Sequence, residues 1–169
     1  MKNFKTYLFF LDDHKAFSED IRKKFDDPFR YVIQFVHSYE ELFKAISKEK
    51  EKKHCKIAVI DMHDQSGKPE TDTFLNSILG AGISGIILIC AQDKLEEIIQ
   101  TTHTRIDAII PQNSNLILRI HNAAKKIISE HNIRLRKKRR DRSLIALLAF
   151  VMLALIALFI IWRRLPQHF

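Results

Sequence analysis

Five short apolar runs recur along the first 130 residues, and each is followed by a longer segment in which apolar residues return at helical spacing. The runs carry few polar residues, as expected for parallel strands that are covered on both faces of a sheet. They start about 20–30 residues apart, which leaves room for a helix between consecutive strands. The predicted strands are residues 6–11, 31–36, 56–60, 85–90 and 106–110.

The segments between these runs are typical of amphipathic helices. Phe17, Ile21 and Phe25 repeat every four residues and form one apolar stripe. Further along, Ser38 and Glu41 have the spacing of a capping box. Helical segments that alternate with five buried strands predict an α/β protein with a flavodoxin-like, doubly wound, five-stranded parallel sheet.

Residues that start or stop helices mark the later helical segments. Gly80 and Gly82 follow an apolar stripe and are expected to end that helix, and Asp93 is the expected N-cap of the next one. No strong helix breaker follows Ser114 before residue 144, so the last helix is expected to continue toward the C-terminus. Its expected buried residues are Leu116, Ile117, Ile120, Ala124 and Ile127.

An uninterrupted apolar run, Leu144–Trp162, contains no charge, glycine or proline in its 19 residues. As a helix it would be about 28 Å long, close to the hydrocarbon thickness of a bilayer. It is apolar on every face, whereas a helix at the edge of a soluble core is apolar along one stripe. The sequence therefore predicts a soluble domain (1–130), a basic juxtamembrane helix or linker (131–143), a single transmembrane helix (144–162) and a short tail across the membrane (163–169).

The net charge of +8 is concentrated beside this run. Residues 134–164 carry nine Arg or Lys and one Asp, so residues 1–133 have balanced charge. Seven of the basic residues precede the run and two follow it, which predicts an N-terminal domain in the cytoplasm of a single-pass protein of the cytoplasmic (inner) membrane. The two cysteines fit such a reducing compartment. The basic segment could bind nucleic acid non-specifically, but membrane topology already explains it, so no nucleic-acid partner is expected.

Three carboxylates follow predicted strands that are neighbours in a flavodoxin-like sheet. Asp12 and Asp13 come directly after the first strand, and Asp61 comes directly after the third. Functional groups of such sheets gather at the carboxyl ends of the strands. Two like charges about 4 Å apart repel by about 4 kcal/mol at an effective dielectric constant near 20. A divalent cation such as Mg²⁺, a cationic side chain or a raised pKa would have to offset this repulsion.

These residues resemble the acidic signature of response-regulator receiver domains. Leu11-Asp12-Asp13-His14 and Val59-Ile60-Asp61-Met62 are the two runs that carry the resemblance, and the succession of elements from residue 5 to about 130 fits the receiver layout. The resemblance implies that Asp61 accepts a phosphoryl group. It also implies that Asp12, Asp13, Asp61 and the backbone carbonyl of His63 bind Mg²⁺. A histidine kinase or a phosphotransfer protein would then be the partner.

Two positions depart from the receiver pattern. Cys90 stands at the end of the fourth strand, where receivers carry Ser or Thr, and Gln112 stands where they carry Lys after the fifth strand. A thiol is a weak hydrogen-bond donor, and Gln brings no positive charge. In addition, Ile109 replaces the aromatic residue that receivers use as a switch. These departures predict weakened phosphoryl chemistry.

The sequence therefore favours a membrane-tethered, degenerate receiver-like domain that is not an enzyme and acts by protein–protein interaction. The alternative is a working Mg²⁺-dependent phospho-acceptor in a two-component phosphorelay. Pairing of the long C-terminal helix in a homodimer stays open, because the helix lacks sustained heptads.

Overall fold

The computed structural model describes residues 5–11, 15–49, 53–62 and 69–164, with the backbone alone at 15–17, 69–71, 139, 142 and 162–164. Within these ranges the chain forms one five-stranded sheet. The strands are β1 (Thr6–Leu11), β2 (Tyr31–Val36), β3 (Cys55–Asp61), β4 (Gly85–Cys90) and β5 (Ala108–Pro111).

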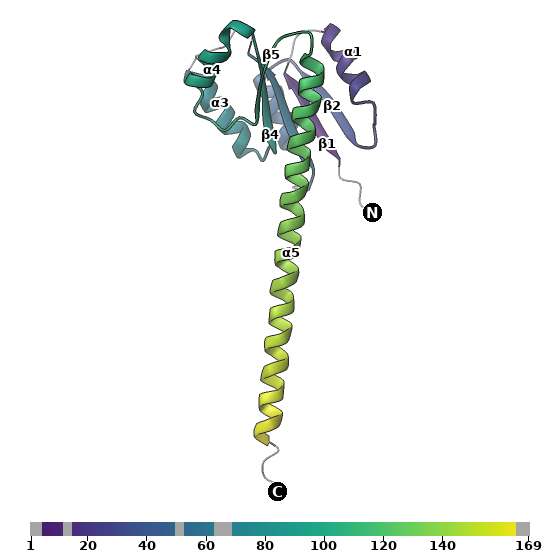
Figure 1. Cartoon of the computed structure of the whole chain (residues 1–169), viewed down its shortest axis with the longest axis vertical. Helices are drawn as coiled ribbons and strands as arrows, with labels where there is room; N and C mark the ends of the chain where they lie inside the picture. The colour runs from purple at the N-terminus through teal and green to yellow at the C-terminus, as the bar shows by residue number, and fades with distance from the viewer. Residues whose placement is uncertain (1–4, 12–14, 50–52, 63–68, 165–169) are drawn as a thin grey trace. The chain divides into compact units, whose positions relative to one another are not determined.

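The sheet has the strand order β2-β1-β3-β4-β5, and all four pairings are parallel (Figure 1). This order confirms the predicted flavodoxin-like α/β fold. The register places the last residue of β1, Leu11, opposite Ile60, and places Asp61 opposite Ile89. The carboxyl ends of β1, β3 and β4 therefore lie side by side.

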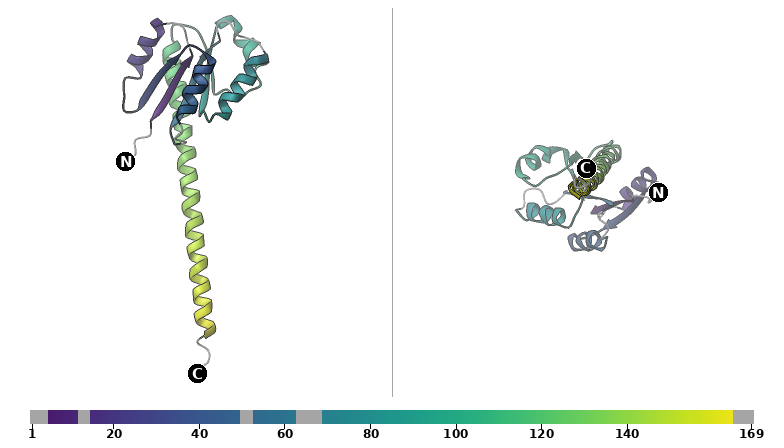
Figure 2. Two further views of the ribbon diagram at one scale, coloured as in Figure 1. Left: turned by 180° about the vertical axis from the view of Figure 1, so that it is seen from behind. Right: turned by 90° about the horizontal axis from the view of Figure 1, so that it is seen from below.

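Helices cover both faces of the sheet, as the near-continuous apolar strands require. The helices are α1 (Lys15–Lys24), α2 (Tyr39–Lys48), α3 (Pro69–Gly80), α4 (Leu95–Thr101) and α5 (Leu116–Arg164), with a short 3₁₀ turn η1 (Gln92–Lys94) before α4. The apolar residues of α1 and α5 pack on one face, and those of α2, α3 and α4 pack on the other. Figure 1 shows α5 in front of the sheet, and the left view of Figure 2 shows α2 on the opposite face.

Strand residues alternate between the two faces. Leu8 and Phe10 of β1 pack with α1 and α5, whereas Phe9, between them, packs with α2 and α3. All three side chains are at most 1% exposed. Because helices cover both faces, β1, β3 and β4 contribute apolar residues to the core on either face.

Most of the predicted helix ends agree with the structure. Ser38 is the N-cap of α2 and its hydroxyl accepts the N–H of Glu41, while the Glu41 carboxylate accepts the N–H of His37 instead of that of Ser38. The helix α3 ends at Gly80, and Gly82 follows in the left-handed region with φ +89°. The Asp93 N-cap prediction is wrong. Asp93 lies inside η1, and α4 begins after Lys94 without a side-chain cap.

The chain divides into two compact units, residues 1–131 and 132–169, and the boundary between them falls within α5. The part in the first unit buries Leu116, Ile120, Ala124, Ile127 and Ile128 against the sheet, and Ile117 is partly buried there. The helix also contains a strongly apolar stretch, none of which is buried. By length and composition this helix could cross a membrane.

Candidate functional site

The carboxyl ends of β3, β4 and β5 are joined by backbone hydrogen bonds just beyond the strands. The N–H of Met62 donates to the carbonyl of Ile89 over 2.9 Å, and the N–H of Gln112 donates to the carbonyl of Cys90 over 2.8 Å. Asp61 is the last residue of β3 and is half-buried between these neighbours. A carboxylate therefore stands at the end of the central strand.

Cys90 lies close to Asp61 at this edge of the sheet. Its side chain is 1% exposed. Burial raises the pKa of the Cys90 thiol, and the negative charges of Asp61 and Asp93 raise it further. The thiol is thus protonated at neutral pH and can only be a weak hydrogen-bond donor, because the thiolate is the reactive form.

Gln112 follows β5 directly, and its side chain is exposed. The backbone hydrogen bond to Cys90 fixes its N–H beside the end of β4. The amide can donate a hydrogen bond toward an anion, but it cannot neutralise one. At the described part of this edge, the Cys90 thiol is therefore influenced by the charges of Asp61 and Asp93, and Gln112 is an uncharged donor.

The other predicted site residues, Asp12, Asp13 and His63, lie outside the described residues. Among the residues that the structure describes, no three His, Cys, Asp or Glu side chains are grouped so that they could hold a metal ion. The predicted magnesium site is therefore untested. Among the described residues, Asp61 offers the hard oxygen ligands that a divalent cation prefers.

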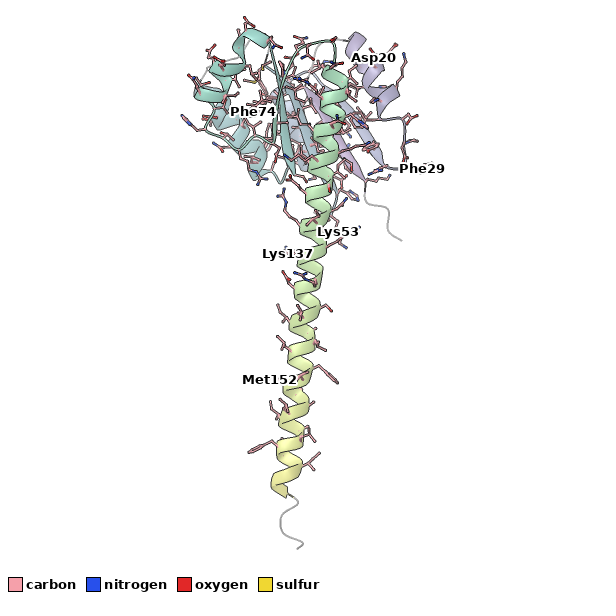
Figure 3. All side chains as sticks on the ribbon, viewed as in Figure 1. Asp20, Phe29, Lys53, Phe74, Lys137 and Met152 are labelled. Atoms are coloured by element: carbon pink, nitrogen blue, oxygen red, sulfur yellow. The ribbon has the colours of Figure 1, made fainter. Side chains whose placement is uncertain are left out.

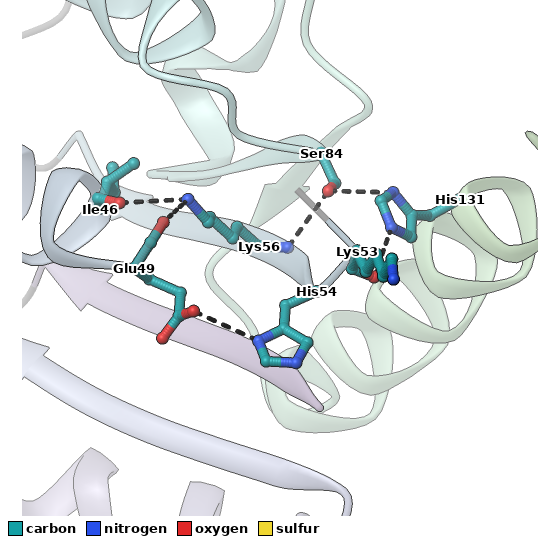
Figure 4. Close-up of polar contacts among 7 residues, drawn as sticks. All are labelled: Ile46, Glu49, Lys53, His54, Lys56, Ser84 and His131. Carbon is teal, nitrogen blue, oxygen red and sulfur yellow. Dashed lines mark hydrogen bonds and ion pairs between the residues drawn. The ribbon is translucent and has the colours of Figure 1, made fainter. Parts of the chain in front are cut away.

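The opposite edge, where the strands begin, carries a polar cluster that the sequence did not reveal (Figure 4). The ammonium of Lys56, a residue only 6% exposed, donates to the carbonyl of Ile46 over 3.2 Å and also to the carbonyl of Glu49. Burial lowers the pKa of Lys56, and the charge of Glu49 opposes this shift. The Glu49 carboxylate also pairs with His54 Nδ1 at 3.3 Å. Lys56 thus holds the end of α2 against β3.

His131 connects α5 to the same edge. Its Nδ1 lies 3.1 Å from the hydroxyl of Ser84, and its Nε2 lies 3.3 Å from the carbonyl of Lys53. Ser84 in turn accepts the backbone N–H of Lys56 over 3.1 Å. A neutral imidazole with its proton on Nε2 satisfies all three contacts, because Nε2 donates to the carbonyl and Nδ1 accepts from the hydroxyl. A lone His on a helix gives no sequence signal for such a connection.

The fold defines a flavodoxin-like α/β protein. The carboxyl ends of its strands carry acidic residues, and its long last helix, α5, contains a strongly apolar stretch. No family model and no curated protein matches the chain. Among solved structures, it is similar to one described as a yeast Spc42 trimeric coiled coil, amino acids 181–211, fused to another structure. The TM-score is 0.52 at 12% identity, over 90% of this chain and 95% of that one. This similarity shows the fold alone.

Proposed function

We propose that this protein is a membrane-tethered, receiver-like signalling module that acts by protein–protein contact and has weakened phosphoryl chemistry. The domain of residues 1–130 recruits or scaffolds a signalling partner, such as a histidine kinase or a phosphotransfer protein. The helix holds this domain at the cytoplasmic face of the inner membrane, which the chain crosses once.

The environment of Cys90 is the observation that carries the proposal. A protonated, buried thiol occupies the position where a receiver places a hydroxyl, and an exposed, uncharged amide follows β5 where a receiver places a cation. Phosphoryl transfer to a carboxylate spreads negative charge over three oxygens, and oriented donors or cations must stabilise that charge. Loss of one such donor typically lowers a rate by about 10²–10³. Mg²⁺, if bound by Asp12, Asp13, Asp61 and the His63 carbonyl, would supply part of this neutralisation.

Phosphorylation by a small phosphodonor tests the proposal. The full-length protein in nanodiscs is incubated with Mg²⁺ and acetyl phosphate, and its intact mass is followed, with Asp61→Asn as the control. We expect little or no addition of a phosphoryl group to the unsubstituted protein. Rapid stoichiometric addition that Asp61→Asn abolishes would contradict the weakened chemistry.

The double variant Cys90→Thr/Gln112→Lys makes the same experiment sharper. It restores a hydroxyl and a cation at the two departing positions, so we expect phosphorylation at least about 10²-fold faster than in the unsubstituted chain. Cys90→Thr/Gln112→Met, which lacks the added charge, is the matched control. An unchanged rate in the Lys variant would mean that these two residues do not limit the reaction.

The second candidate function is a working phospho-acceptor in a phosphorelay. The position of Asp61 at the end of the central strand, beside Cys90, favours it. It predicts that Mg²⁺ and then beryllofluoride shift NMR signals around Asp61 and along β4 and β5. No shift of these signals with either reagent would exclude a working phospho-acceptor.

A further inference from the structure

An exposed aromatic side chain projects from a tight turn at the edge where the strands begin. Phe29 is 77% exposed. Its turn is held closed by Asp27, whose carboxylate oxygen accepts the N–H groups of Phe29 and Arg30 over 3.1 and 3.2 Å. The Asp27 carbonyl also accepts the N–H groups of Arg30 and Tyr31. The turn therefore has a well-defined backbone, and the Phe29 side chain is exposed to solvent.

Basic residues flank Phe29 along the same edge. The carbonyl of Arg30 accepts the N–H of Thr6 over 2.8 Å, and the carbonyl of Lys5 accepts the N–H of Cys55 over 3.3 Å. Arg30, Lys5 and Lys53 therefore precede three adjacent strands, and all three are exposed. Figure 3 labels Phe29 and Lys53 toward the lower end of the sheet domain. We call Lys5, Phe29, Arg30 and Lys53 the basic edge.

Two acidic residues, Asp26 and Asp27, are also exposed on the Phe29 turn. The Asp27 carboxylate is engaged by the two backbone N–H groups of the turn. His54 and Glu49, next to Lys53, pair with one another. The three basic side chains therefore exceed the two exposed carboxylates of the turn by one positive charge, and the Arg30 guanidinium lies 5.4 Å from the centroid of the Tyr31 ring.

Only a short segment of the chain separates this edge from the apolar run. The part of α5 that belongs to the first unit ends at His131, which contacts Ser84 and Lys53 at the starts of β4 and β3. Residues 132–143 alone separate His131 from the apolar run that begins at Leu144. Even a fully extended connection of this length reaches only about 40 Å. When the run spans a bilayer, the edge where the strands begin is joined to it by the shortest stretch of chain. This is the edge that carries Phe29.

We infer that the basic edge docks on the surface of an anionic bilayer, with Phe29 inserted at the level of the headgroups. An aromatic ring at the interface between basic side chains is the arrangement that peripheral membrane surfaces use. This inference rests on the membrane part of the proposed function, not on its phosphoryl chemistry. Docking leaves the carboxyl-end edge, with Asp61, at the far end of the strands and open to a partner.

Fluorescence quenching by brominated lipids in nanodiscs tests the inference. The chain has one tryptophan, Trp162, at the end of the apolar run, so the unsubstituted protein reports whether the run is inserted. In a Trp162→Phe background, Phe29→Trp reports on the basic edge. Phe43→Trp is the matched control, because Phe43 is an exposed aromatic residue (45%) on α2.

We expect the Phe29→Trp emission to be quenched about twofold more than the Phe43→Trp emission in phosphatidylglycerol nanodiscs. The difference should shrink in phosphatidylcholine nanodiscs, and in phosphatidylglycerol when Arg30→Glu is added. Circular dichroism verifies that each variant is folded.

Other outcomes overturn the inference in distinguishable ways. Quenching of Trp162 without extra quenching of Phe29→Trp would reject docking and leave the membrane anchor standing. Equal quenching of Phe29→Trp in both lipids would reject the role of the basic residues. Absence of Trp162 quenching would reject the anchor and the docking together.

Discussion

Asp72 is a residue whose role became visible only in the folded chain. Its carboxylate accepts the hydroxyl of Thr104 over 2.8 Å and the N–H groups of His103 and Thr104, each over 3.3 Å. The Thr104 hydroxyl, followed by the two backbone N–H groups, lowers the pKa of Asp72, while burial acts in the opposite direction. These contacts attach α3 to the segment between α4 and β5.

Thr104→Val should destabilise the domain by about 1–2 kcal/mol at pH 7, because it removes the hydroxyl hydrogen bond to a charged group. The pKa of Asp72 is depressed in the folded state, so its contribution is present above the ordinary value of 3.8 and is lost as the pH falls through the folded pKa. The difference in the free energy of unfolding between Thr104→Val and the unsubstituted protein should therefore become smaller in acid. Urea unfolding in micelles, followed by near-ultraviolet circular dichroism at pH 7 and pH 3, measures it. A difference that is constant over this range would contradict the ionic contribution of Asp72.

At the scale of elements, the strands were predicted well where apolar runs end at sharp polar boundaries. The runs 6–11, 31–36 and 85–90 coincide with β1, β2 and β4. The strand β5 begins two residues later than predicted, at Ala108. There, Asp107 accepts the N–H of Ile86 with its side chain, and its own N–H donates to the carbonyl of Ile86. This contact with β4 could not be read from one segment.

The packing of α5 on β4 depends on Gly85. A Cβ at this position would lie 2.7 Å from Ile127 Cγ2 and 2.9 Å from Asp107 Oδ2. Gly85→Ala should therefore destabilise the domain by about 1–3 kcal/mol through overpacking. Gly80→Ala, at the end of α3, is the control, since a Cβ added there would meet no atom of the described residues within 4 Å. Urea unfolding that ranks the two variants equally would contradict this account.

At the scale of the whole molecule, the apolar stretch makes α5 long and apolar enough to cross a membrane. A central charge should oppose its insertion, because Arg at the middle of a spanning helix costs about 2.5–3.5 kcal/mol on insertion scales. Ala154→Arg should thus lower the membrane fraction that resists carbonate extraction, whereas Ala154→Leu should leave it unchanged. Equal resistance of both variants would argue against a spanning helix.

The sequence by itself determined the fold class and the apolar character of the last helix. Both depend on patterns that are local to single segments, namely continuous apolar runs, helical stripes and 19 residues without a charge. The tertiary structure decided which distant residues meet. It placed the Cys90 thiol in the field of Asp61 and Asp93, attached His131 to Ser84 and Lys53, and brought Lys5, Arg30 and Lys53 to one edge around the Phe29 turn. These groups are separated along the chain, and only the parallel pairing of the strands fixes their neighbours.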